Sequence, residues 1–204
     1  MIRYALPLLL AITVGMTSAA SPDNGGDVTA RVEIVDDVVR VEVEANIAAS
    51  AREIWEVLTD FENLPRFVSN VVSSKVVARE GNIVRVAQTG KGSFGPFSFQ
   101  FQSVRELTLT PVEKFETRMV EGNFKRFRGT TRLDANAGMT RVRYQSESVP
   151  ETLLPLSFIR SSIESKTREH YLEISREVLR RKNLAAVTQP PQSPLKVGAG
   201  ETAN

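Results

Sequence analysis

The sequence has no cysteine and a single histidine, His170, among its 204 residues. The absence of cysteine excludes disulfides, thiol nucleophiles and thiolate metal ligands. One histidine excludes a histidine-rich zinc site, and the carboxylates show no metal-ligand spacing, so we expect neither metal nor cofactor. An excess of one charge is also missing, because 26 basic and 24 acidic residues leave a formal charge of +2. A chain so nearly balanced is not built for non-specific binding of nucleic acid.

Long hydrophobic runs are absent except at the N-terminus. Arg3 precedes an apolar run at 4–16, and the small residues Ser18, Ala19 and Ala20 follow it. The run is too short for a comfortable membrane span, whereas this order is typical of a secretory signal peptide. We expect a signal peptide at 1–20, cleaved near Ala20, and export to the periplasm if the host is Gram-negative. The alternative is an uncleaved N-terminal anchor.

Hydrophobic alternation predicts a series of β-strands after a polar linker at 21–27. The expected strands cover 28–34, 39–47, 71–79, 83–89, 97–109, 115–120, 124–134 and 140–149. Apolar residues then recur at helical spacing from about Leu154 to Lys182, which predicts one long helix. The remaining residues, 183–204, contain three prolines and no periodicity, so we expect a disordered tail. Strands segregated from one long helix favour a single α+β domain at 28–182.

Two short helices are predicted between the second and third strands. Ser50 followed by Glu53 forms a capping box at the start of the first helix. Thr59 and Glu62 repeat this pattern around Asp60, which predicts a second helical turn that a proline ends. Capping then explains the acidic residues here without general acid–base chemistry.

These motifs carry a resemblance to a known family. The stretch EIWEVLTDFENLPRFV resembles the N-terminal helix pair of the START-like SRPBCC superfamily, in its polyketide cyclase/dehydrase and coenzyme Q-binding branch. The stretch EGNFKRFRGTTRLDANAGMTRVRYQSESVP is similar to the paired late strands of that family. The resemblance covers about Val28 to Lys182. It implies a helix-grip fold, in which a curved antiparallel sheet wraps around a long C-terminal helix and encloses an apolar cavity for a hydrophobic small molecule.

The fifth predicted strand supplies the first candidate ligand-binding residues. Phe97, Phe99 and Phe101 alternate with polar residues, which is typical of an apolar cavity wall and equally of a solid core. Arg105 has the same parity, and a buried cation is costly unless it is paired. Arg105 is therefore a candidate for binding a carboxylate, phosphate or carbonyl group. The alternative is a β-bulge near Ser103 that turns Arg105 outward.

The last strands and the long helix supply the other candidates. Tyr144 has inward parity and is a polar group able to orient a mostly apolar ligand. Ile163, Thr167 and His170 share the buried stripe of the helix. As a catalytic base, His170 would need an orienting partner within hydrogen-bond reach. The alternative is a packed imidazole bonded to a strand hydroxyl, and we assign no catalytic residue.

Two further patterns have simple explanations. The segment Gly90–Gly95 matches G-x-G-x-x-G, but a strand follows it rather than a helix, which indicates a flexible hairpin loop and not a dinucleotide site. Arginines also share the outward parity of the last two strands, with Glu116 and Glu147 as potential partners. These arginines are Arg126, Arg128, Arg132, Arg141 and Arg143. They form either a patch for anionic lipid headgroups or an ordinary solvated face.

Three functions stay open on the sequence alone. The leading hypothesis is an exported carrier for a lipid, isoprenoid or quinone, with transient contact to an anionic membrane surface. The second is a cyclase or dehydratase that acts on a hydrophobic substrate in the same cavity. The third is a protein-interaction module. The absence of cysteine and of any metal-binding pattern weakens the enzyme hypothesis.

Overall fold

A computed structural model describes residues 26–94, 97–151 and 156–188, with only the backbone described at 93–94, 97–99 and 157–159. The predicted signal peptide at 1–20 and the tail beyond Thr188 lie outside the described residues.

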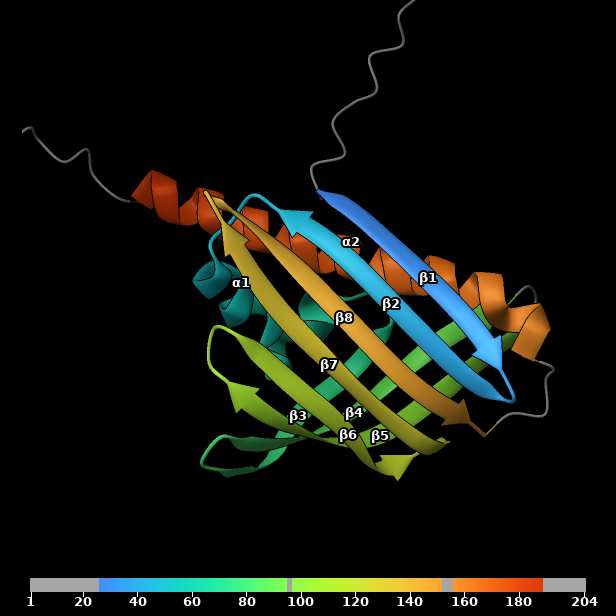
Figure 1. Cartoon of the computed structure of the whole chain (residues 1–204). Helices are drawn as coiled ribbons and strands as arrows, with labels where there is room; N and C mark the ends of the chain where they lie inside the picture. The colour runs from blue at the N-terminus through green and yellow to red at the C-terminus, as the bar shows by residue number, and fades with distance from the viewer. Residues whose placement is uncertain (1–25, 95–96, 152–155, 189–204) are drawn as a thin grey trace, which may run out of the picture.

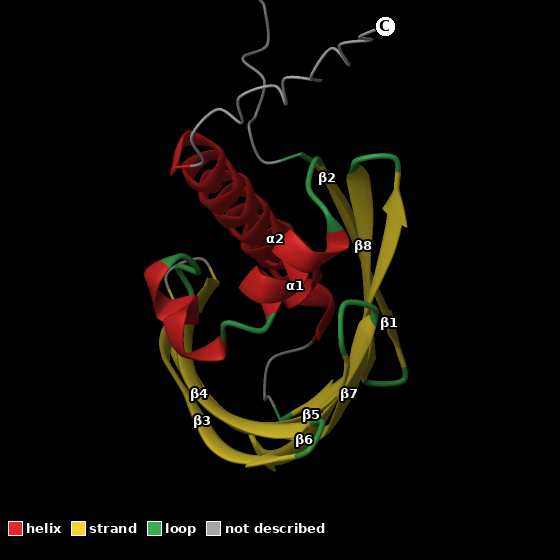
Figure 2. Ribbon diagram, turned by 90° about the vertical axis from the view of Figure 1, so that its left-hand side faces the viewer, coloured by secondary structure: helices red, strands yellow, loops and turns green. Residues whose placement is uncertain are grey.

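One antiparallel sheet dominates the fold, with the strand order β1-β2-β8-β7-β6-β5-β4-β3. The sheet curves around the long helix α2 (Leu156–Thr188), as Figures 1 and 2 show. The helix-grip α+β fold predicted from the sequence is thereby confirmed. The strands are β1 (Asp27–Val35), β2 (Val38–Ile47), β3 (Val71–Glu80), β4 (Ile83–Phe94), β5 (Phe97–Thr110), β6 (Lys114–Gly122), β7 (Phe124–Asn136) and β8 (Met139–Pro150).

Strand β4 corrects the prediction for the glycine-rich segment. Its residues up to Phe94 pair with β5 instead of forming a flexible loop, and Gly90 lies opposite Phe101. The Phe101 ring occupies the space where a Cβ of residue 90 would stand, and the carbonyl oxygen of Asn70 lies 2.6 Å from that point. Glycine is therefore required here for close packing, and the cross-strand ladder overrides its backbone freedom.

The first short helix begins as predicted, but the second does not. In α1 (Ala51–Leu58), the backbone N–H of Glu53 donates to Ser50 Oγ at 3.3 Å, and the Ser50 N–H donates to the Glu53 carboxylate at 2.7 Å. The predicted second capping box at η1 (Phe61–Arg66) is wrong, since this turn has no side-chain cap. The Thr59 hydroxyl instead donates to the Trp55 carbonyl at the end of α1.

Asp60 likewise has a role that capping did not predict. Its carboxylate accepts from Asn63 at 2.8 Å and forms an ion pair with Arg181 of α2 at 2.7 Å. This contact joins the short helices to α2.

Helix α2 lies against β1, β2 and α1, and its inner face is buried. Arg160 and Arg168 donate from Nε to the carbonyl oxygens of Val32 and Val28, which fixes the helix along β1. The helix continues to Thr188, so the prediction that disorder begins at residue 183 is wrong. No helix in the described part of the chain is long and apolar enough to cross a membrane.

Candidate functional site

A cluster of large polar side chains lies between the sheet and α2, within an interior that is mostly apolar. Arg105 comes from β5, Tyr144 from β8, and His170 and Tyr171 from α2. The ring centroids of Tyr144 and Tyr171 are 5.7 Å apart, and those of His170 and Tyr171 are 5.6 Å apart. The charge of Arg105 affects the pKa of all three neighbours. Side chains distant in the sequence thus form one site.

Arg105 points inward, which decides between the two alternatives left by the sequence. Leu107 and Leu109 have the same parity and belong to the hydrophobic core, whereas Glu106 pairs with exposed arginines on the opposite face of the sheet. The pairing of β5 with β6 does shift register between Val104 and Arg105, but this irregularity does not turn Arg105 outward. Its Nε is buried without a hydrogen-bond partner among the described residues. Burial lowers the pKa of the guanidinium.

The two tyrosines stay protonated at neutral pH. Burial raises the pKa of Tyr144 and raises that of Tyr171 well above 10.0. The nearby Ser146 and Thr131 side chains oppose these shifts without cancelling them. The phenols are therefore neutral groups able to donate hydrogen bonds.

His170 is neutral at neutral pH. Burial lowers its pKa to about 4, and the positive charge of Arg105 acts in the same direction. Its described contact is the edge-to-face packing on Tyr171. The predicted bond to a strand hydroxyl does not form within the described residues, and no carboxylate there orients the ring as a catalytic base would require.

The structure describes only some of the other predicted ligand-binding side chains. Phe101, Ile163 and Thr167 are half-buried, and Ile163 packs against the core. Phe97 and Phe99 lie on β5, but their side chains are outside the described part of the structure.

Tyr171 is the residue that the sequence analysis missed. It lies four residues after Thr167, so it shares the helical stripe already assigned to the interior. Its side chain is only 7% exposed. The helical period alone was sufficient to find it.

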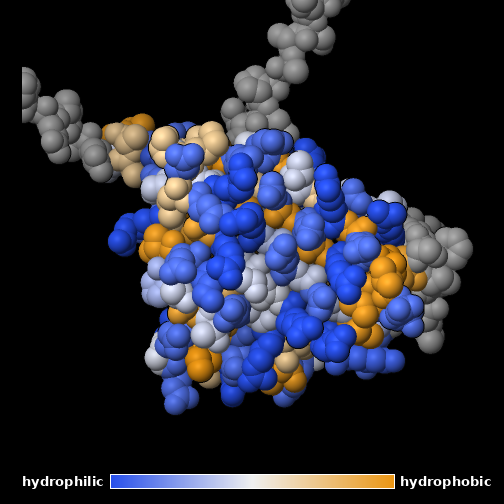
Figure 3. All heavy atoms as spheres, viewed as in Figure 1, coloured by the Kyte–Doolittle hydropathy of each residue, from blue (hydrophilic) through white to orange (hydrophobic). Residues whose placement is uncertain are grey.

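Two of the five outward arginines form ion pairs along the solvent face of the sheet. Arg128 Nη2 lies 2.9 Å from the Glu147 carboxylate, as predicted, and Arg143 pairs with Asp134 at 2.7 Å. Glu116 pairs with Lys114 instead of an arginine. A groove of about 600 Å³ crosses this face, and Figure 3 shows hydrophilic residues spread over it.

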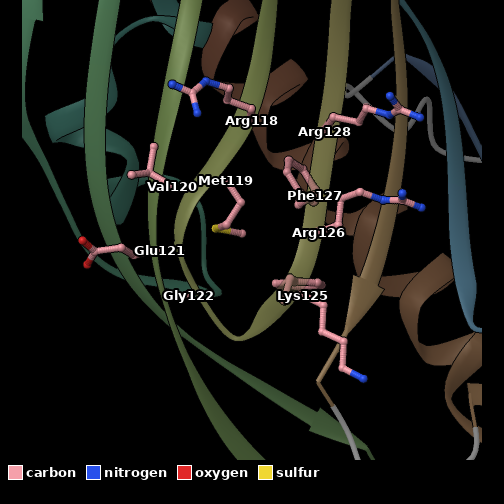
Figure 4. A pocket seen from close by; sticks show the side chains of 10 residues that line it. Arg118, Met119, Val120, Glu121, Gly122, Lys125, Arg126, Phe127 and Arg128 are labelled. Carbon is pink, nitrogen blue, oxygen red and sulfur yellow. The ribbon is translucent and has the colours of Figure 1, made fainter.

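A second groove, of about 430 Å³, lies where the β6–β7 hairpin splays apart. Cross-strand pairing ends at Arg118 and Arg128, and Figure 4 shows Met119 and Phe127 between the two arms of the hairpin. Met119 is also the β6 partner of Arg105. The groove therefore lies one strand away from the buried guanidinium.

Comparison with known proteins identifies the class. Residues 47–173 match the family described as polyketide cyclase / dehydrase and lipid transport. The chain therefore belongs to this family, whose members bind hydrophobic small molecules such as lipids. No curated protein sequence matches the chain.

Solved structures of a cyclase and of a lipid transfer protein share the fold. The Zhui aromatase/cyclase from Streptomyces sp. R1128 is 16% identical, with a TM-score of 0.64, covering 72% of this chain and 98% of its own. The STAR-related lipid transfer protein from Xanthomonas axonopodis is 16% identical, with a TM-score of 0.61 and coverage of 75% and 93%. Human STARD10 is 13% identical, with a TM-score of 0.62 and coverage of 79% and 73%.

Proposed function

We propose that this protein is an exported carrier that holds a hydrophobic small molecule of the lipid, isoprenoid or quinone type between the sheet and α2. The proposal rests on one observation about the polar cluster. Burial is the largest influence on the pKa of Arg105, Tyr144 and His170, yet all three residues keep part of their surface accessible. Side chains surrounded by protein but still partly accessible line an internal hollow, the usual form of a small-molecule site.

The test is to fill that hollow and measure what the protein retains. Protein purified from its own compartment is examined by native mass spectrometry, followed by lipid extraction. Ile163→Trp should abolish the bound mass and leave the circular dichroism spectrum unchanged, because its larger side chain takes the ligand's space. Leu184→Trp is the matched control, since Leu184 lies on the same helix and is 54% exposed. Retention of ligand by the Ile163 variant, or absence of any ligand in the native protein, would contradict the proposal.

Export and membrane contact belong to the same proposal. Arg3, the apolar run at 4–16 and the small residues before Ser21 support a cleaved signal peptide. N-terminal sequencing should find the mature protein beginning near Ser21. The cationic groups of β7 and β8 support transient contact with anionic membranes, which cosedimentation with vesicles of phosphatidylglycerol against phosphatidylcholine tests at low and high salt.

A cyclase or dehydratase activity is the second candidate, favoured by the state of His170. A neutral imidazole packed on the protonated Tyr171, which in turn contacts Tyr144, is able to exchange protons with a bound substrate. In that case His170→Gln should leave ligand binding within about tenfold of the wild type and reduce turnover by about a hundredfold or more. Full turnover by this variant would remove His170 from the chemistry.

A further inference from the structure

The charge of Arg105 has no partner in the described part of the protein. Among the described residues, no hydrogen bond or ion pair reaches its side chain, and its Nε is buried without a partner. The adjacent carboxylate, Glu106, points to the other face of the sheet, where it pairs with Arg85 at 2.8 Å and with Arg118 at 2.6 Å. A buried cation without a counter-ion is one of the costliest arrangements in a protein interior.

The neighbours of Arg105 do not supply the missing negative charge. Tyr144 and Tyr171 have raised pKa values and remain neutral, and His170 has lost its proton at neutral pH. The cluster thus carries one net positive charge and several hydrogen-bond donors, from both the sheet and α2. A planar guanidinium flanked by neutral donors is complementary to a single oxyanion, which it binds through two parallel hydrogen bonds.

We propose that the ligand is an amphiphile with one anionic head, a carboxylate or a phosphate, and that Arg105 is its counter-ion inside the protein. This inference rests on the proposed carrier function and narrows its ligand class. The chain of the amphiphile lies among the apolar side chains around Ile163 and Phe101, and its head lies at Arg105. Uncharged quinones and isoprenoid hydrocarbons leave the guanidinium unpaired and bind less tightly.

Three probes with the same sixteen-carbon chain separate the head from the tail. Palmitate carries a carboxylate, hexadecyl phosphate a phosphate, and hexadecanol neither. Dissociation constants are measured on the delipidated mature protein by displacement of a fluorescent fatty acid. We expect at least one anionic probe to bind about tenfold or more tightly than hexadecanol, and the preferred anion identifies the head group.

Arg105→Met supplies the test of the residue itself. It should remove the preference for the anion and leave the affinity for hexadecanol within about threefold of the wild type. Arg132→Met is the matched control, since Arg132 is an exposed arginine of the same sheet, and it should change neither affinity. A second measurement requires no variant. The titration midpoint of His170 is measured by proton NMR. Palmitate or hexadecyl phosphate should raise this midpoint, because the anion offsets the field of Arg105. Hexadecanol should leave it unchanged.

The outcomes distinguish this inference from the proposed function. Equal affinity of the wild type for all three probes, or an equal loss for all three in Arg105→Met, would overturn the anionic-head inference and leave hydrophobic binding intact. Failure of every probe to bind, together with no lipid in the native protein, would contradict the carrier function itself.

Discussion

Acidification should destabilise this protein through His170. Burial beside Arg105 lowers the folded-state pKa from 6.5 to about 4, so folding favours the neutral imidazole. Between pH 6.5 and about pH 4, His170 therefore carries a proton in the unfolded chain but not in the folded protein. Stability conferred by the neutral ring is complete above about pH 6.5 and is lost as the pH falls toward 4. At about 1.4 kcal/mol per pKa unit, the free energy of unfolding should fall by about 2 kcal/mol between pH 8 and pH 5.

The assay compares the wild type with His170→Gln, because glutamine keeps a polar side chain that does not titrate. Urea unfolding at pH 8, 7, 6 and 5 is followed by the fluorescence of Trp55, the single tryptophan. Other groups, such as Glu177 with a pKa of about 2, titrate in both proteins and cancel in the comparison. The wild type should lose about 2 kcal/mol more than the variant over this range.

An independent readout follows from the presence of one histidine. Its imidazole signal in a proton NMR titration is unambiguous, and its midpoint should lie near 4. Parallel losses of stability in the two proteins, or a midpoint close to 6.5, would refute the burial of a neutral ring beside a cation.

Three further predictions concern stability without ligand. Arg105→Met should raise the free energy of unfolding, measured by urea unfolding, by about 1 to 3 kcal/mol, because it removes an unpaired buried charge. The control Arg132→Met should change it by less than about 0.5 kcal/mol. A lower stability of Arg105→Met would show that the cation is paired. Gly90→Ala should cost about 1 to 3 kcal/mol by the same assay, because its Cβ overlaps the Phe101 ring, and a neutral result would mean that the ring moves freely aside. Ser50→Ala should lower the thermal midpoint by the equivalent of about 1 kcal/mol, and no change would argue against the capping box.

Local interactions explain what was predictable from the sequence. A strand alternates faces every residue, and a helix start requires an acceptor for its first N–H groups. Alternation and the Ser50–Glu53 pair were therefore sufficient to place the strands along the chain and to predict the start of α1. The inward parity of Arg105 and Tyr144, and the helical stripe that carries His170, follow from the same short periods. These patterns involve residues within a few positions of one another, which a linear sequence displays directly.

Contacts between distant residues decided the rest. Gly90 belongs to a strand because the Phe101 ring and the β5 ladder hold it there. Thr59 closes one helix instead of opening another, and Asp60 pairs with Arg181, far along the chain. Above all, the sequence places Arg105 next to Glu106 but does not show that the carboxylate serves two arginines on the opposite face. Folding separates the two charges, since neighbouring residues of a strand point to opposite sides of the sheet. It leaves the guanidinium inside, without a counter-ion among the residues that the structure describes.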